Sequence, residues 1–350
     1  MAGVIFCKEV DFVVKRQGNT MFFENTPCVA GYGSAVGKKE SEGPLKGEFD
    51  KVIYDSYAGT ESFEKAESVF IREAVSMALG KARIKAEDIG LAFAGDLLNQ
   101  CTASSLGLRD YKMPYIGVYS ACSTMALSLL LSSVSVESGA TSLALSAASS
   151  HFCSAERQYR FPLEYGSLRT PTSQWTVTGA GCCILKGKGN TNDDDIFIPC
   201  ATVGVINDLG VTDQNNMGAA MAPAACDTLE NFLRDTNTSP DDYDAIFTGD
   251  LGVLGSELFR ELIKKDIGYT LANHKDCGVL MYGDDKTVCC GGSGAGCCAS
   301  VLCSHILPSM MSKRYKNILF MATGALLSPT SVSQGESIHS IAHLINFRCK

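Results

Sequence analysis

Asp88-Ile-Gly-Leu-Ala-Phe-Ala-Gly-Asp-Leu97 recurs later in the chain, because Asp242-Tyr-Asp-Ala-Ile-Phe-Thr-Gly-Asp-Leu251 matches it at five of ten positions. Each copy reads as a short apolar strand that ends in a Gly-Asp turn, and a helical stretch precedes each copy. A second pair of similar strands, Ser142–Ala147 and Asn317–Ala322, follows in the same order. Two matches in one order, each in a strand–helix–strand context, indicate an internal duplication.

Apolar periodicity predicts helices and strands that alternate along the chain. Glu64–Ala82 carries one apolar helical stripe, whereas Met125–Val136 is apolar on nearly all sides and predicts a helix buried between sheets. Short apolar runs, typical of strands covered on both faces, occur at Leu143–Ala147, Cys182–Leu185 and Ile318–Ala322. We therefore expect an α/β fold with mostly parallel or mixed sheets.

Two polar segments are interpreted as connections. Lys38–Asp50, with the sequence KKESEGPLKGEFD, is expected to be a charged surface loop. Thr191–Asp195 is expected to link two halves, residues 1–190 and 196–350, that form one compact unit.

The composition describes a compact chain with a large interior. Of 350 residues, 45% are hydrophobic and 19% are charged, and the formal net charge is −8. This acidic balance, without a Lys/Arg cluster, argues against a nucleic-acid partner. Charge appears as early as Lys8, and the longest apolar run, Met125–Val136, is far shorter than the roughly 20 residues of a membrane-spanning helix. We expect no signal peptide and no transmembrane segment, whereas peripheral contact with a membrane stays open.

The chain has 16 cysteines, and their placement argues against metal binding and disulfides. No Cys-x-x-Cys occurs, and the adjacent pairs lie among Gly, Ala and Ser at Cys182–Cys183, Cys289–Cys290 and Cys297–Cys298. Adjacent residues of a strand point to opposite faces, so such pairs would not share a metal. We expect most cysteines to be small buried side chains in a reducing compartment, and we expect no metal site.

One cysteine has a special position. Tyr119-Ser-Ala-Cys-Ser-Thr-Met-Ala126 places Cys122 at the start of the buried helix, and the offset of 175 residues between the two halves sets it opposite Cys297. The positive end of a helix dipole lowers the pKa of a thiol and favours a nucleophile. Simple packing would also account for Cys122, but its place in the duplicated halves favours a function.

These features resemble the thiolase superfamily of thiolases and β-ketoacyl synthases. Cys122 falls on the nucleophile position of that superfamily, Thr178–Leu185 is similar to the strand that closes the first half, and Gly291–Ser300 is similar to the Gly-rich turn into the second central helix. The resemblance covers most of the chain and implies a thiolase-like duplicated αβαβα layered fold with two pseudo-symmetric halves. It also implies a homodimer, in which Asn99 and Gln100 would lie in the loop that crosses to the partner subunit.

The sequence departs from that superfamily at the catalytic positions. The acyl-transfer enzymes use a histidine of the second half, plus a further His or Asn. Phe247-Thr-Gly-Asp-Leu251 stands where the first His is expected, and Gly292 stands in place of the second residue. An anionic Asp250 would oppose the oxyanion that forms during acyl transfer. We therefore expect a chain that is not an enzyme.

Four longer motifs are similar to the stage V sporulation protein AD family of endospore-forming bacteria: Ser149–Pro162, Met217–Ala225, Phe247–Leu251 and Ala322–Pro329. This resemblance implies a non-enzymatic protein that binds dipicolinic acid or its calcium chelate. It implies transport of that compound into the developing spore, together with other proteins of the same sporulation operon. It also implies a peripheral position on the cytoplasmic side of the spore inner membrane.

Dipicolinate is a flat aromatic ring with two carboxylates, so its site needs cations or N–H donors and an apolar wall. The segment after the strand Leu143–Ala147 offers His151, Arg157, Tyr159 and Arg160. Strand ends in this fold open toward the cavity of the nucleophile, which is why we place these residues at the site. Ordinary solvated charge is the alternative for both arginines, and a buried core position is the alternative for His151.

The acidic candidates are less specific. Asp250 takes the position of the lost histidine and could bind calcium or a protonated ring nitrogen, although turn chemistry would also account for it and for its counterpart Asp96. Asp208 lies in an acidic loop that could serve the calcium chelate. No EF-hand spacing occurs, so neither a built-in calcium site nor a cofactor is predicted.

A second function stays open. Cys122 would be the nucleophile of a thiolase-like acyltransferase, with His151 or His305 as an unorthodox base. Cys122 and His305 are also candidates for contact with the dipicolinate ligand. His305 follows Cys303 on a predicted helix, where a core or capping role is the alternative.

Overall fold

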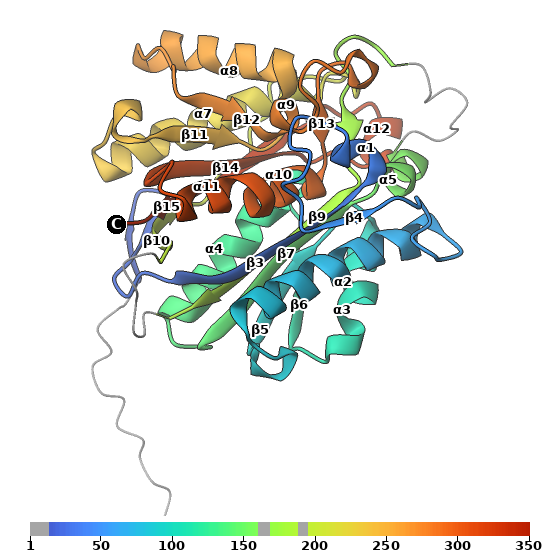
Figure 1. Ribbon diagram of the computed structural model, residues 1–350. Coiled ribbons are helices and arrows are strands. Elements are labelled where there is room, and N and C mark those ends of the chain that lie inside the picture. Colours follow the sequence, from blue (N-terminus) through green and yellow to red (C-terminus); the bar gives the residue numbers. More distant parts are fainter. Residues whose placement is uncertain (1–13, 160–168, 188–194) are drawn as a thin grey trace, which may run out of the picture.

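The computed structural model describes residues 14–159, 169–187 and 195–350, and its elements stack in five layers from top to bottom of Figure 1. The uppermost layer contains the helices α7 (Met217–Thr236) and α8 (Gly252–Ile267). Below it lie five strands, β10 (Phe197–Thr202), β11 (Ala245–Thr248), β12 (His274–Asp276), β14 (Asn317–Ala325) and β15 (Ser340–Arg348). The central layer holds α4 (Thr124–Glu137), α10 (Ala295–Val301) and α11 (Leu307–Met311).

Two further layers complete the fold. The second set of strands comprises β3 (Cys28–Gly37), β5 (Leu91–Gly95), β6 (Tyr115–Gly117), β7 (Leu143–Ser150) and β9 (Gly179–Lys186). The helices α2 (Phe63–Ala82) and α3 (Thr102–Leu108) cover them from below. Smaller elements lie at the edges and around the site: β1 (Val14–Gln17), β2 (Thr20–Phe23), α1 (Lys38–Ser41), β4 (Lys51–Ile53), α5 (Phe152–Tyr159), β8 (Trp175–Thr176), α9 (Cys277–Tyr282), β13 (Gly292–Ser293) and α12 (Pro329–Ser333).

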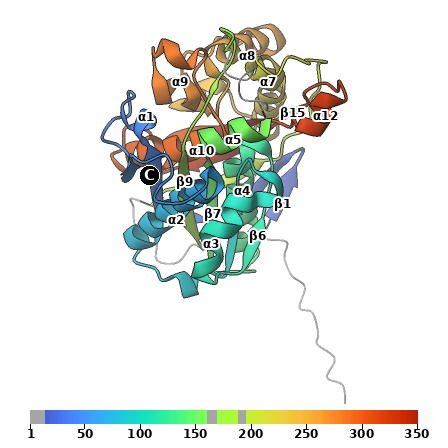
Figure 2. The same cartoon turned by 90° about the vertical axis from the view of Figure 1, so that its right-hand side faces the viewer.

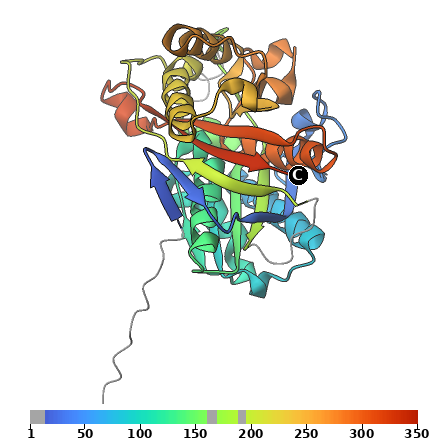
Figure 3. The same ribbon diagram turned by 90° about the vertical axis from the view of Figure 1, so that its left-hand side faces the viewer.

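The strand order confirms the duplicated fold. The strands follow one another as β12-β11-β14-β15-β10-β3-β9-β7-β5-β6. From the centre outward, each half has two antiparallel pairings followed by two parallel pairings. Because β11 and β5 take the same place in their halves, the repeated Gly-Asp turns lie at equivalent strand ends. The hairpin β1–β2 adds to β10, and Figure 3 shows it as the blue arrows beside the middle of the sheet.

The predicted helices and strands are confirmed, with small differences at their ends. The amphipathic segment forms α2, which begins at the Ser62 N-cap, whose side chain accepts a hydrogen bond from the Lys65 N–H. The helix predicted to be buried forms α4, which lies between the two halves of the sheet in Figure 1. The three apolar runs lie within β7, β9 and β14.

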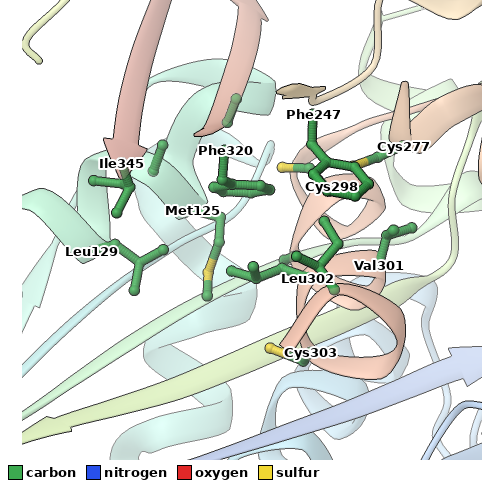
Figure 4. Close-up of a cluster of buried hydrophobic side chains, with 14 of the residues drawn as sticks. Met125, Leu129, Phe247, Cys277, Cys298, Val301, Leu302, Cys303, Phe320 and Ile345 are labelled. Atoms are coloured by element: carbon green, nitrogen blue, oxygen red, sulfur yellow. The ribbon is translucent and has the colours of Figure 1, made fainter. Parts of the chain in front are cut away.

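The core around the central layer combines large apolar side chains with alanines, cysteines and methionines. Met125 and Leu129 of α4 face Phe320, while Cys298 and Leu302 approach from the opposite helix (Figure 4). A Cβ on Gly181 of β9 would meet the Ala299 carbonyl oxygen at 2.1 Å, so glycine is required where α10 crosses the sheet. The cysteines of the described residues are not joined in disulfides, and all except Cys153 and Cys289 are buried, as expected for small packed side chains.

One prediction about the connections is wrong. Lys38–Asp50 is not a plain surface loop, because it begins with α1 and buries Glu40 and Leu45. The Glu40 carboxylate accepts hydrogen bonds from the Thr178 N–H and the Tyr282 hydroxyl, which hold it inside the fold. The expected linker Thr191–Asp195 lies almost entirely outside the described residues.

Candidate functional site

Cys122 lies where α4 begins, at the interface between the two halves. A single 3-10 turn, Ala121–Ser123, precedes the helix. Ala121, directly before Cys122, adopts a positive φ of 47°, which is a strained backbone conformation for a residue with a side chain. Cys122 is 6% exposed, and its Sγ lies 3.9 Å from the Ser293 hydroxyl. Ser293 belongs to β13, which pairs with the short strand β8 from the first half.

Asp250 contacts the same serine from the end of β11. Its Oδ2 accepts hydrogen bonds from the Ser293 hydroxyl at 3.2 Å and from the Gly294 N–H at 3.0 Å. Its Oδ1 accepts one from the Thr323 hydroxyl at 2.9 Å. The structure therefore brings together Cys122 and Asp250, two residues that the sequence placed at the site, and joins them through a serine that the sequence analysis did not single out.

The electrostatics of this cluster correct the expectation for Cys122. Burial and the neighbouring charge of Asp250 raise the pKa of the Cys122 thiol well above its ordinary value. The helix dipole does not overcome these two effects, so Cys122 is a protonated thiol near neutral pH. Burial, with a smaller contribution from the charge of Asp276, raises the pKa of Asp250 to about 7, although its hydrogen bonds oppose the shift.

A histidine that the sequence analysis did not assign supports the turn before Cys122. The Gly204 N–H donates to Nδ1 of His343 at 3.2 Å, so the ring proton lies on Nε2 and donates to the Ser120 hydroxyl at 3.2 Å. Burial lowers the pKa of His343 to about 4, which keeps this ring neutral. His343 lies within β15, and only its pairing with Ala322 of β14 brings it to the site, so no local signal marks it.

Tyr159 approaches the cysteine from α5, which Figure 2 shows in front of the central layer, between the outer helices. Its hydroxyl donates to the Leu97 carbonyl oxygen at 2.6 Å and lies 3.4 Å from the Tyr119 hydroxyl. Burial raises the pKa of Tyr159, so its hydroxyl stays protonated. Two aromatic rings therefore lie near Cys122.

A pocket of about 390 Å³ opens beside α5, and three predicted residues contribute to it. Arg157, Asn99 and Gln100 lie in its wall. The full lining is Glu64, Leu98, Asn99, Gln100, Thr102, Ser154, Arg157 and Gln158. Nη1 of Arg157 lies 3.4 Å from the Glu64 carboxylate, and about half of its side chain is exposed. The wall thus offers one guanidinium, several amides and hydroxyls, and one carboxylate.

The other predicted site residues lie elsewhere. His151 is buried against Phe63 and Phe70; its Nδ1 accepts from the Cys153 N–H, and its Nε2–H therefore donates to the Ser56 carbonyl oxygen at 2.9 Å. His305 contacts the Glu48 carboxylate at 2.7 Å. Asp208 lies in an exposed loop, where its carboxylate accepts from the Ser337 hydroxyl at 2.6 Å. Arg160 lies outside the described residues.

One group of side chains in the described part of the chain has a spacing that a metal ion could use. Cys226, Glu230 and Asp266, on α7 and α8, place one ligand atom each within 4.8 Å of the others. These helices form an outer layer, and none of the three residues contributes to the pocket beside α5.

The turn that leads into β13 carries local strain. Cys289 has φ 58° and ψ −103°, and the Gly291 N–H donates to the Val288 carbonyl oxygen, so Cys289 takes the position of a type II′ turn that favours glycine. We expect Cys289→Gly to raise the free energy of unfolding by about 1 kcal/mol, since relief of backbone strain exceeds the entropy that glycine adds to the unfolded chain. Urea unfolding would measure the change.

The neighbouring cysteine supplies the control for this experiment. The buried Cys290 thiol donates to the Pro171 carbonyl oxygen at 3.1 Å, so Cys290→Gly should lower the free energy of unfolding. A Cys289→Gly variant that is no more stable than the wild-type chain would contradict the assignment of strain.

Comparison with solved structures places this architecture in a class. The chain is similar to 3-oxoacyl-[acyl-carrier-protein] synthase III from Aquifex aeolicus, with a TM-score of 0.55 and 11% identity over 92% of this chain and 99% of that one. It is similar to a variant of OleA from Xanthomonas campestris, with a TM-score of 0.58 and 15% identity over 95% and 99% of the two chains. The fold, with a buried cysteine at the start of its central helix, is that of a thiolase-like protein.

Sequence comparison narrows the class to one family. The family described as Stage V sporulation protein AD matches residues 17–348. Stage V sporulation protein AD of Bacillus subtilis (strain 168) is 42% identical over 329 residues, which cover 94% of this chain and 96% of the relative. The chain belongs to the Stage V sporulation protein AD family, and its role lies in sporulation. Among the described residues, no helix has the length and apolar character required to cross a membrane.

Proposed function

We propose that this chain binds dipicolinic acid, as the free dianion or the calcium chelate, and helps to move it into the developing spore. The observation that carries the proposal is the pocket beside α5, whose lining includes Arg157, Asn99 and Gln100. A guanidinium and amide N–H groups are suitable donors for two carboxylates. The volume of about 390 Å³ is ample for one pyridine ring with its two carboxylates.

We further propose that the chain is not an enzyme. The thiol of Cys122 is held protonated by burial and by Asp250, whereas acyl transfer requires a thiolate. The two bases considered for an acyltransferase are engaged elsewhere, His151 with Ser56 and His305 with Glu48. Transfer of an acyl group from acyl-CoA to Cys122 of the wild-type chain would support the acyltransferase alternative instead.

The proposal includes a homodimer that works with other proteins of the same operon at the cytoplasmic side of the spore inner membrane. β6 is the last strand of the sheet among the described residues, and its outer edge faces away from β5. Ile116 of β6 and Tyr119, two residues after the strand, are 43% and 45% exposed, which suits burial against a second copy of the chain. Asn99 and Gln100 remain the residues proposed to meet that copy, and because they also line the pocket beside α5, the proposed ligand site would lie next to the dimer interface.

Arg157→Ala is expected to weaken dipicolinate binding about five- to tenfold, because it removes one charge-assisted contact from a half-exposed position. Isothermal titration calorimetry with dipicolinate, in the presence and absence of calcium, would measure the change, with picolinate and benzoate as comparison ligands. Arg109→Ala is the matched control, since the exposed Arg109 side chain lies 3.6 Å from Asp110 and outside the pocket.

Three outcomes of this experiment are distinguishable. Selective binding of dipicolinate that only Arg157→Ala weakens would support the pocket beside α5. Equal binding by the wild-type chain and Arg157→Ala would place the ligand elsewhere. The absence of saturable binding in the folded wild-type chain would overturn the proposed function.

A further inference from the structure

Two buried carboxyl groups lie directly behind the pocket beside α5. Glu67 of α2 is 1% exposed, and Asp96, which follows β5, is fully buried. Both are hydrogen-bonded to the pocket wall: Oε2 of Glu67 accepts from the Ser154 hydroxyl at 2.7 Å, and Oδ1 of Asp96 accepts from the Leu98 N–H at 2.9 Å. Any charge on this pair therefore acts on whatever occupies the pocket.

The remaining hydrogen bonds of the pair come from neutral donors. Oε1 of Glu67 accepts from the Ser149 hydroxyl at 3.0 Å. Oδ2 of Asp96 accepts from the Ser104 hydroxyl at 2.6 Å and from the Ser104 N–H at 2.8 Å. Within the described ranges, no cation forms an ion pair with either carboxyl group. Two ionised carboxylates in such surroundings would repel each other without compensation.

The other titratable groups around the pair do not supply a positive charge. On α2, Glu64 is acidic and pairs with Arg157 of α5 at the pocket rim. Glu156, also on α5, pairs with Arg169. The groups that face Asp96 from the remaining elements are the thiol of Cys101 and the hydroxyls of Tyr115 and Tyr119. Burial raises the pKa of all three, so they stay neutral near pH 7. The nearby His151 is also neutral, since burial lowers its pKa.

Burial and the charge of Asp96 raise the pKa of Glu67 to about 8, and burial also raises the pKa of Asp96. This direction agrees with the geometry, because a single proton on the pair removes the repulsion between the two carboxylates. The pair is therefore a proton-holding group in contact with a pocket that is suited to anions.

We propose that Glu67 and Asp96 hold one proton between them while the pocket is occupied, so that a small dicarboxylate anion and a proton bind together. This inference rests on one part of the proposed function, namely that the ligand of this pocket is an anion. A dianion in the pocket stabilises the protonated pair, and the protonated pair in turn removes a negative charge from behind the ligand. The two binding events therefore favour each other.

The sign of the pH dependence follows from this coupling. A bound anion raises the pKa of Glu67 further, so the complex takes up a proton when it forms near pH 8. Affinity is then highest below about pH 8 and falls as the pair loses its proton at higher pH. In the ligand-free chain, protonated Glu67 contributes to the free energy of unfolding. This contribution is fully present below the pKa that Glu67 has in the unfolded chain, and it is lost as the pH rises through the pKa that Glu67 has in the folded chain.

Calorimetry with dipicolinate at pH 7 and pH 9, each in two buffers of different ionisation enthalpy, tests the proposal. For the wild-type chain we expect binding about five- to tenfold weaker at pH 9 than at pH 7, with net proton uptake near pH 8. Glu67→Gln, which mimics the protonated side chain, should bind with little change between these pH values and without proton uptake from this pair. Glu87→Gln, at an exposed position outside the pocket, should behave like the wild-type chain.

A second measurement does not need the ligand. Thermal unfolding of the ligand-free wild-type chain between pH 5 and 9 should show a loss of stability on raising the pH that Glu67→Gln reduces. Dipicolinate binding without proton uptake or pH dependence in the wild-type chain would overturn this inference and leave the proposed function intact. The absence of binding at every pH would overturn the proposed function and the coupling with it, even if the two stability profiles differed.

Discussion

Asp250→Asn is expected to make the Cys122 thiol react with iodoacetamide roughly ten- to a hundredfold faster at pH 8, because the thiolate fraction rises tenfold for each unit by which the pKa falls. The substitution removes the negative charge that opposes the thiolate. It preserves the size of the side chain and one carbonyl oxygen for the hydrogen bonds from Ser293 and Gly294. The helix dipole would then act on Cys122 without the opposing carboxylate.

Burial limits the gain, since Cys122 is only 6% exposed and its desolvation persists in the variant. This is why we expect an increase of one to two orders of magnitude rather than the full reactivity of an exposed thiolate. The pH dependence of alkylation, followed on the peptide that contains Cys122, would report the change in pKa directly.

Two controls make the experiment specific. Cys153, which is partly exposed, serves as an internal reference in the same chain. Ser293→Ala removes the hydroxyl between Cys122 and Asp250 but retains the charge, so its Cys122 should stay slow to react. If Asp250→Asn left the rate at Cys122 unchanged relative to Cys153, the conclusion that Asp250 suppresses the nucleophile would be wrong.

Arg169→Gln is expected to lower the free energy of unfolding by about 2–4 kcal/mol, because it removes the cation of a buried ion pair together with the contacts of its guanidinium. Nη2 of Arg169 lies 2.9 Å from the Glu156 carboxylate, and the two side chains are 12% and 7% exposed. Nη1 donates to the Gln174 carbonyl oxygen at 2.8 Å. The guanidinium also lies over the ring of Trp175, at 4.6 Å from its centroid.

This ion pair also supports the candidate site. Gln174 donates from its side chain to the carbonyl oxygens of Asp250 and Gly292, so the segment that Arg169 holds also positions the loop beside Cys122. Loss of Arg169 should therefore loosen the site as well as destabilise the fold.

Urea unfolding followed by far-ultraviolet circular dichroism would measure the loss. The double variant Glu156→Gln/Arg169→Gln should be more stable than Arg169→Gln alone, since the negative charge that Arg169 balances is then removed as well. Arg109→Gln, which disrupts an exposed ion pair, should change the free energy of unfolding by at most about 0.5 kcal/mol. A loss in Arg169→Gln no larger than in this control would show that the buried pair contributes little.

Local sequence patterns predicted the elements of this fold well where burial is periodic along the chain. The stripe of α2, the uniformly apolar α4 and the runs within β7 and β14 all reflect which faces are covered, and that information is present in each segment alone. The short helix α1 was missed because its buried Glu40 is stabilised by Thr178 and Tyr282, which are distant in the sequence.

The residues of the candidate site also fall into two groups, those found from the sequence and those found only in the structure. Cys122 and Asp250 were found from their motifs, and Arg157 was found from the chemistry that a dicarboxylate requires. The placement of His343 behind Ser120 had no counterpart in the sequence patterns, nor did the contact of Ser293 with both Cys122 and Asp250. His151 was predicted to contact the ligand because its side chain can donate hydrogen bonds, but in the structure it is buried and hydrogen-bonded to Ser56 and Cys153.

The duplicated α/β architecture and the family could be predicted from the sequence, since repeated motifs and apolar periodicity are properties of short segments. The protonation state of Cys122 and the burial of Glu67 with Asp96 could be read only from the folded chain. A pKa depends on desolvation and on the charges that surround a group in space. Those surroundings come from β5, β11, β13 and the central helix α4, which meet only after the two halves pack together.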